Sequence, residues 1–123
     1  MLRVLLVDDE PLIKAAFRKM IPWEEEGFQI AGTASNGQEA LRLLETCPAD
    51  IVITDLKMPQ MNGIDLIKAW KQNLFEGVML VLSNYADFEL VREALVAGAA
   101  DYMLKVNLNA ETLLGQLRNA RDT

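Results

Sequence analysis

The sequence predicts an α/β fold in which five parallel strands form one doubly wound sheet, covered by helices on both faces. Short apolar runs alternate with segments whose apolar residues recur at helical spacing, and this pair occurs five times. The apolar runs are continuous, as in strands that are buried on both faces. A length of 123 residues, 51% of them hydrophobic, suits one compact domain, and we expect residues 1–123 to form it.

The first two strands are expected at residues 4–7 and 28–34, each followed by a helix. Pro11 suits the first turn of the first helix, because the N–H that proline lacks would have no partner there. That helix is expected to end by Pro22 and to bury one apolar face, made of Leu12, Ile13, Ala16, Phe17 and Met20. A turn and cap at Asn36 precede the second helix, whose core-facing residues are expected to be Ala40, Leu41 and Leu44.

The third strand is the β-branched run at residues 51–54, which leads directly into Asp55. The helix after it is expected to bury four apolar side chains: Ile64, Ile67, Trp70 and, a turn later, Leu74. The fourth strand spans residues 78–82 and ends at Ser83.

A fourth helix is expected from Asp87 to Val96, with its apolar positions at Leu90, Val91, Ala94 and Leu95. A short fifth strand at residues 101–104 ends at Lys105. Asn109 then caps a last helix, in which Leu113, Leu114, Leu117 and Ala120 share a face.

Composition excludes several classes of function. The net charge of −6 argues against direct contact with nucleic acid or with an anionic membrane. The chain has no histidine, which excludes Ser-His-Asp and Cys-His catalysis and most zinc sites. Its one cysteine, Cys47, allows no intrachain disulfide, as is usual in a reducing compartment. No signal sequence or run of about 20 apolar residues is present, so we expect a cytoplasmic location.

Polar side chains gather where the predicted strands end. Asp8 and Asp9 follow the first strand, Asp55 the third, Ser83 the fourth and Lys105 the fifth. In an open parallel sheet, ligands bind at the carboxyl ends of the strands, around the point where the strand order reverses. We therefore expect three carboxylates, a hydroxyl and an ammonium group to converge on one crevice, with Asp55 at its centre.

Such a cluster predicts a bound cation and phosphoryl chemistry. Two like charges about 4 Å apart repel by roughly 1–4 kcal/mol, so three carboxylates need a cation between them. Oxygen ligands without His or Cys favour Mg²⁺. Phosphoryl transfer needs mainly positioning and neutralisation of the phosphoryl oxygens, and a carboxylate can be the covalent acceptor. We therefore interpret Asp55 as a phosphate acceptor.

Four segments together resemble the receiver domain of two-component response regulators. They are V-D-D-E at residues 7–10, D-L-K-M-P-Q-M-N-G at 55–63, L-S at 82–83 and G-A-A-D-Y-M-L-K at 98–105. The resemblance covers nearly the whole chain. It implies a flavodoxin-like three-layer (βα)5 sandwich with strand order 2-1-3-4-5, and a phosphorylation-dependent signalling switch.

The resemblance also implies roles for residues at the acceptor. Asp55 receives the phosphoryl group from the phosphohistidine of a sensor histidine kinase. Asp9 and Asp55 hold Mg²⁺ together with the main-chain carbonyl of Lys57, and Asp8 acts on the metal directly or through water. The chain is then no ordinary enzyme, since it catalyses only its own phosphorylation and slow dephosphorylation.

Further roles concern the response to phosphorylation. Lys105 pairs with Asp55 and then with the phosphoryl group, and Ser83 swings to bind a phosphoryl oxygen. Tyr102 is the coupled aromatic residue that turns inward, while Lys57 and Tyr85 tune the lifetime of the acyl phosphate. The surface that changes is made by the fourth helix, the fifth strand and the last helix, through which a homodimer can also form.

One position departs from the family pattern, which usually has proline after the lysine, often with a cis peptide bond. Val106 stands there. The Lys105–Val106 bond is therefore either trans, with a reshaped loop, or cis and strained, since a cis bond before a non-proline residue costs about 2.5–4 kcal/mol. A degenerate receiver that acts as a phosphorylation-independent interaction module is the main alternative function.

Two other classes fit less well. An Mg²⁺-dependent aspartyl phosphatase of the haloacid-dehalogenase kind has a second acid two residues after the nucleophile, where this chain has Lys57. A flavin-binding protein of the same topology needs a Ser/Thr/Gly-rich phosphate loop after the first strand, where this chain has Asp8 and Asp9.

The sequence contains no output domain after its last helix, so we expect a stand-alone receiver or a fragment of a longer regulator. The segment S-N-Y-A-D-F-E at residues 83–89 resembles receivers joined to AraC-type helix-turn-helix domains. This favours transcription regulation, with DNA contacts made outside the receiver.

Overall fold

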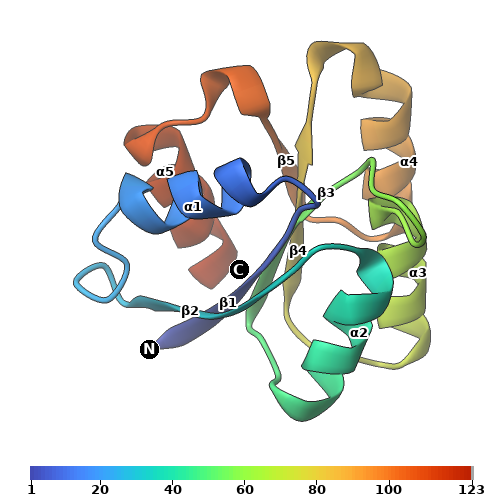
Figure 1. The fold of residues 1–123 in the computed structure, drawn as a ribbon, viewed down its shortest axis with the longest axis horizontal. Coiled ribbons are helices and arrows are strands. Elements are labelled where there is room, and N and C mark those ends of the chain that lie inside the picture. Colours follow the sequence, from blue (N-terminus) through green and yellow to red (C-terminus); the bar gives the residue numbers. More distant parts are fainter. Residues whose placement is uncertain (123) are drawn as a thin grey trace.

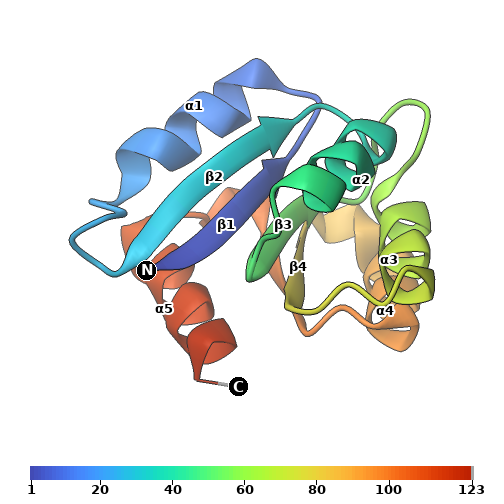
Figure 2. The same ribbon diagram turned by 90° about the horizontal axis from the view of Figure 1, so that it is seen from below.

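The computed structural model describes residues 1–122, which form a five-stranded parallel sheet with helices on both faces (Figures 1 and 2). The strands are β1 Leu2–Val7, β2 Phe28–Ala34, β3 Ile51–Asp55, β4 Val78–Ser83 and β5 Asp101–Leu104. The helices are α1 Pro11–Met20, α2 Gly37–Thr46, α3 Gly63–Gln72, α4 Phe88–Ala97 and α5 Ala110–Arg121. The predicted fold class and the predicted strand order β2-β1-β3-β4-β5 are both confirmed.

Two apolar cores, one on each face, hold the helices to the sheet. On one face α2, α3 and α4 pack against the strands, and on the other α1 and α5 do so, as Figure 1 shows. The central strand β3 is buried along its whole length, because its side chains alternate between the two cores. Asp55 is the last residue of this strand, so the sheet places a carboxylate at the edge of the core.

Four apolar residues predicted to be buried are exposed instead. Leu12 is 83% exposed, because Ile13, Phe17 and Met20 face the sheet and each residue turns a helix by about 100°. Ala16, predicted on the same face, is exposed for the same reason. Leu74 is 85% exposed, because it lies beyond the end of α3 in a turn with φ 56°. Leu95 on α4 is 40% exposed.

Two loops differ in detail from the prediction. Helix α4 begins at Phe88 and not at Asp87, because residues Tyr85–Asp87 form a separate 3₁₀ turn. After β5, residues Lys105–Asn107 form a second 3₁₀ turn. The Lys105–Val106 peptide bond is trans, like all the peptide bonds described. Of the two alternatives open at Val106, the structure therefore has the trans form.

Within residues 1–122, no helix combines the length and the apolar character that crossing a bilayer requires.

Candidate functional site

The ends of four strands meet at one edge of the sheet. Asp8 follows β1, Asp55 ends β3, Ser83 ends β4 and Lys105 follows β5. The registers place Asp55 beside Leu82, the residue before Ser83. The predicted convergence of these residues on the carboxyl edge is therefore what the fold produces.

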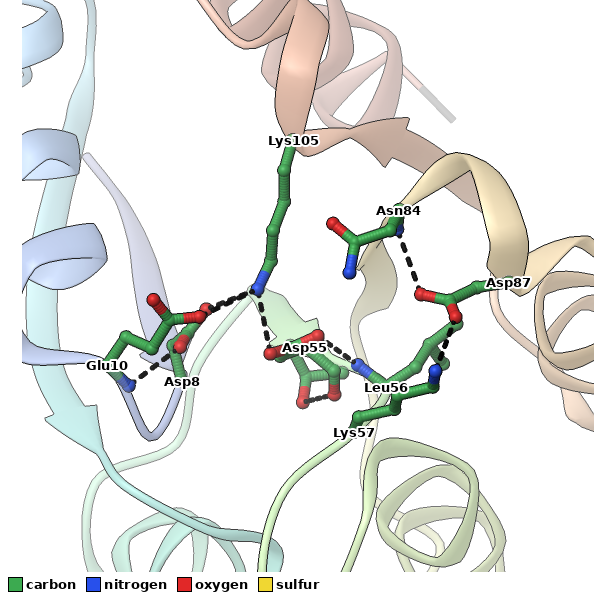
Figure 3. Close-up of polar contacts among 9 residues, drawn as sticks. Asp8, Glu10, Asp55, Leu56, Lys57, Asn84, Asp87 and Lys105 are labelled. Carbon is green, nitrogen blue, oxygen red and sulfur yellow. Dashed lines mark hydrogen bonds and ion pairs between the residues drawn. The ribbon is translucent and has the colours of Figure 1, made fainter.

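Asp55 is a buried carboxylate that is held from two sides. Its side chain is 8% exposed; Oδ1 accepts a hydrogen bond of 2.8 Å from the Leu56 N–H, and Oδ2 accepts one of 2.9 Å from Lys105 Nζ (Figure 3). Burial favours the neutral form of Lys105, but the hydrogen bond and charge of Asp55, with the charges of Asp8 and Glu10, outweigh it. The net effect raises the pKa of Lys105 above its ordinary value, so its ammonium stays charged beside Asp55.

Four carboxylates cluster at this point. Asp8, Asp9, Glu10 and Asp55 each place one carboxylate oxygen within 4.8 Å of the others. Asp8 and Asp55 are buried, whereas Asp9 and Glu10 are exposed. Lys105 Nζ lies 3.7 Å from Asp8 Oδ2 and 3.4 Å from Glu10 Oε1, in addition to its contact with Asp55, so one ammonium faces three of the four acids. The cluster has more negative charge than Lys105 can neutralise.

The pKa of Asp8 reflects its burial first and the neighbouring acids second. Burial, together with the charges of Asp55 and Glu10, raises the pKa of Asp8 to about 6, although the Glu10 N–H and Lys105 oppose the rise. The Glu10 N–H donates to Asp8 Oδ1 over 2.8 Å, which leaves Asp8 Oδ2 without a hydrogen bond. A buried carboxylate oxygen with a raised pKa and no hydrogen-bond donor suits a divalent cation, and the all-oxygen donor set suits Mg²⁺.

Ser83 lies at the end of β4 with its hydroxyl available. The residue is fully buried, and its Oγ has no hydrogen-bond partner within the described chain. Ser83 also lines a groove of about 540 Å³, whose walls include Tyr85, Phe88 and Tyr102. Tyr85 is 67% exposed and Tyr102 is 42% exposed, so neither aromatic ring is packed inside the protein.

A second ion pair lies on the other side of Asp55. Lys57 Nζ is 2.9 Å from Asp87 Oδ1, and the Asn84 N–H donates to Asp87 Oδ2 over 2.9 Å (Figure 3). Asp87 is 3% exposed, while the Lys57 side chain is 63% exposed. The Asn84 hydrogen bond and then the Lys57 ammonium hold the pKa of Asp87 below its ordinary value, against the effect of burial.

Two acids of this site were not predicted from the sequence. The sequence predicts no role for Glu10 beyond its place in the V-D-D-E segment, and it predicts Asp87 only as the start of a helix. A signal for Asp87 does exist, because Asn84 and Asp87 have the spacing of a capping box, in which an acid reaches back to the first N–H of a turn. Glu10 has no comparable signal, since acids before a helix are common.

Gly63 brings the start of α3 close to Asp55. A Cβ at this position would collide with the main chain of Asp55 and Leu56. The Gly63 N–H donates to the Leu56 carbonyl over 3.0 Å, which closes the loop between β3 and α3. This glycine, the last residue of the 55–63 segment, is therefore required by a close approach of two backbones.

The fold and the site belong to a recognisable family. The sequence model of the family "Response regulator receiver domain" matches residues 4–118, and the chain belongs to this family.

Known relatives and solved structures agree with that assignment. The chain is 37% identical over 105 residues to an uncharacterised response regulatory protein of Staphylococcus epidermidis, covering 85% of this chain and 41% of the relative. It is 35% identical over 119 residues to the transcriptional regulatory protein HptR of Staphylococcus aureus, covering 95% and 46%. The chain thus spans less than half the length of these curated relatives.

Among solved structures, the REC domain of AraT, a response regulator from Geobacillus stearothermophilus, superposes with a TM-score of 0.89. The two sequences are 30% identical, and the match covers 98% of this chain and 93% of that one. A response regulator receiver domain protein from Clostridium thermocellum superposes with a TM-score of 0.84 at 30% identity, covering 98% and 94%.

Proposed function

We propose that this chain is a phosphorylation-dependent switch of a two-component system, in which Asp55 accepts a phosphoryl group from the phosphohistidine of a sensor histidine kinase. The observation that carries the proposal is the 2.9 Å contact between Lys105 Nζ and Asp55 Oδ2 inside a cluster of acids. A structural ion pair needs no further carboxylates around it, whereas a phosphoryl acceptor needs a charged lysine and a cation site at the same place.

The acidic cluster fits Mg²⁺. Asp8, Asp9 and Asp55 would hold the ion together with the main-chain carbonyl of Lys57, leaving positions for water and a phosphoryl oxygen. Its chemical contribution, when bound, is to neutralise charge on the phosphoryl oxygens. The excess of acids over Lys105 and the raised pKa of Asp8 support this assignment.

The remaining chemistry is done by the protein's own groups. An Asp55 carboxylate oxygen forms a bond to phosphorus while the bond from phosphorus to the imidazole nitrogen of the donor breaks, and the electron pair stays on that nitrogen. Lys105 orients the carboxylate and then binds the phosphoryl group. Ser83, whose Oγ has no partner, donates to a phosphoryl oxygen. Water later hydrolyses the acyl phosphate, and Lys57 and Tyr85 at the rim set its access.

Phosphorylation would change the surface formed by α4, β5 and α5. Phe88 and Val96 on α4 are 70% and 82% exposed, and Tyr102 on β5 is 42% exposed. When Ser83 moves towards the phosphoryl group, Tyr102 turns into the groove that both residues line. The new surface would then contact an output domain or a target protein, or form a homodimer.

We further propose that residues 1–123 are the receiver part of a longer, cytoplasmic transcription regulator with an AraC-type DNA-binding domain. The likeness to a transcriptional regulatory protein more than twice as long supports this, as does the segment at residues 83–89. With a net charge of −6, the receiver itself makes no direct contact with DNA.

Intact mass spectrometry after incubation with acetyl phosphate tests the function. We expect the wild-type chain to gain one phosphoryl group only with Mg²⁺, Asp55→Asn to gain none, and the exposed control Asp65→Asn to behave as wild type. A folded wild-type chain that gains no mass under any condition would instead be the degenerate receiver. The trans bond at Val106 leaves Lys105 in contact with Asp55, which favours the competent form.

A further inference from the structure

The Lys57–Asp87 ion pair joins the two loops that border the acceptor. Lys57 lies two residues after Asp55, in the loop between β3 and α3, while Asp87 lies in the loop between β4 and α4. Figure 3 shows Asp55 between this pair and the contacts that Lys105 makes with the acids. The pair therefore links the acceptor's own loop to the segment that begins at Ser83.

The two partners differ in how freely they can move. Asp87 is 3% exposed and anchored by the Asn84 N–H, whereas the Lys57 side chain is 63% exposed. Lys57 can therefore leave without exposing a core residue. Asp87 keeps the Asn84 hydrogen bond when Lys57 leaves, and it precedes α4, whose positive dipole end also favours an anion. The pair can open at the lysine end without leaving a wholly uncompensated buried charge.

Phosphorylation would change the competition for Lys57. An acyl phosphate replaces the single charge of Asp55 with about two, on oxygens that extend beyond the carboxylate. A mobile ammonium two residues away is then attracted to the phosphoryl group as well as to Asp87. Movement of the Lys57 ammonium from Asp87 to the phosphoryl group would also release the loop that connects Asn84 and Asp87 to Ser83.

We propose that the Lys57–Asp87 pair is a latch in the resting protein, and that Asp87 is a positioning residue for phosphoryl transfer. The latch holds Lys57 away from the phosphodonor and keeps the Ser83–Asp87 loop in its resting place. Opening it supplies Lys57 to the phosphoryl group and frees Ser83 to follow. This inference rests on the proposed role of Asp55 as acceptor.

A double-mutant cycle on the rate of labelling by acetyl phosphate tests the latch. Asp87→Asn keeps an oxygen for the Asn84 N–H but removes the charge that holds Lys57. We expect it to label about 3- to 10-fold faster than wild type, yet to change the rate less than about twofold in a Lys57→Gln background. The control Lys68→Gln, which removes an exposed lysine of α3 outside the pair, should keep the wild-type rate within about twofold.

Hydrogen exchange of the Asn84 amide gives a second readout that needs no phosphodonor. Lys57 does not bond to this amide, so its removal acts only through Asp87. We expect Lys57→Gln to speed exchange at Asn84 by about 3- to 10-fold, since a loosened loop opens more often. The matched control Lys68→Gln, an exposed lysine on α3, should leave exchange unchanged.

The outcomes separate the latch from the proposed function. A wild-type chain that is never labelled overturns both. Labelling of the wild type with equal effects of Asp87→Asn in the two backgrounds overturns the latch alone, because a merely structural Asp87 would act independently of Lys57. Unchanged exchange at Asn84 in Lys57→Gln would also overturn it, and this exposed substitution is not expected to disturb folding.

Discussion

Two lysines flank Asp55, and they are held in opposite ways. Lys105 is 15% exposed and faces Asp8, Glu10 and Asp55, so a mostly buried cation serves several acids. Lys57 is 63% exposed and pairs with one buried acid, Asp87. In the first arrangement the lysine is fixed in place, whereas in the second only the acid is fixed. The comparison suggests that Lys105 serves the chemistry itself, while Lys57 adjusts it.

The largest expected effect separates the two lysines by their contribution to labelling. Lys105→Gln should slow phosphorylation by acetyl phosphate at least about 100-fold, as the loss of one charge-stabilising group typically does. Lys57→Gln should change the rate by less than about tenfold, because Lys57 faces Asp87 in the resting protein. Initial rates measured by intact mass at saturating Mg²⁺ check this. Equal losses in both variants would contradict the comparison.

A second prediction concerns Asp8 in the cluster around Lys105. Its pKa is raised from 3.8 to about 6 in the folded protein, so the folded state holds more protons than the unfolded state between these values. The stability of the metal-free wild type therefore falls as the pH rises from about 4 to about 6. Asp8→Asn removes this loss and should stabilise the metal-free protein at pH 7 by up to about 3 kcal/mol, because the pKa rises by about two units at about 1.4 kcal/mol per unit.

Urea unfolding in EDTA at about pH 4 and pH 7 measures this difference. The same variant should bind Mg²⁺ at least about tenfold more weakly, the loss that even an outer partner of a metal typically causes. The exposed neighbour Asp9 is the control, because Asp9→Asn should weaken Mg²⁺ binding without stabilising the metal-free protein. If Asp8→Asn is no more stable than wild type at pH 7, ionisation of Asp8 does not destabilise the folded protein, and the prediction is wrong.

The smallest expected effects are changes in stability at two acids that occupy similar positions. Glu10 and Asp87 each occupy the position just before a helix, and each contacts a lysine. Asp87→Ala should destabilise the protein by about 1–2 kcal/mol, because the Asn84 N–H loses its acceptor. Glu10→Ala should change stability by less than about 0.5 kcal/mol, since its side chain is 59% exposed and caps no N–H. Denaturant midpoints of both variants check the order.

The residues on the Lys105 side of the site could be predicted from the sequence, because they follow the ends of strands. A run such as residues 51–54 is recognisable as a buried strand, and parallel strands necessarily bring their carboxyl ends together. Asp8, Asp55, Ser83 and Lys105 were found in this way, and the structure places all four at the same edge of the sheet.

On the Lys57 side, Asp87 could not be predicted from the sequence, because it lies four residues beyond the end of β4. Nothing in strand periodicity indicates whether a loop residue turns inwards, and Asp87 is buried only because the 3₁₀ turn directs it towards Asn84. The same limit explains Leu12 and Leu74. Helical spacing identifies apolar residues, but the sheet decides which of them it covers and where the helix ends.

The contact between Asp55 and Lys105 also has a consequence for biosynthesis. The two residues are 50 positions apart, and Lys105 and Glu10 are 95 apart. Chains are made from the N-terminus, so all four acids emerge from the ribosome before the cation that pairs with them. A nascent chain that stops before β5 contains Asp55 without Lys105. Under the proposed function, competence to accept a phosphoryl group is therefore acquired only when synthesis has passed Lys105.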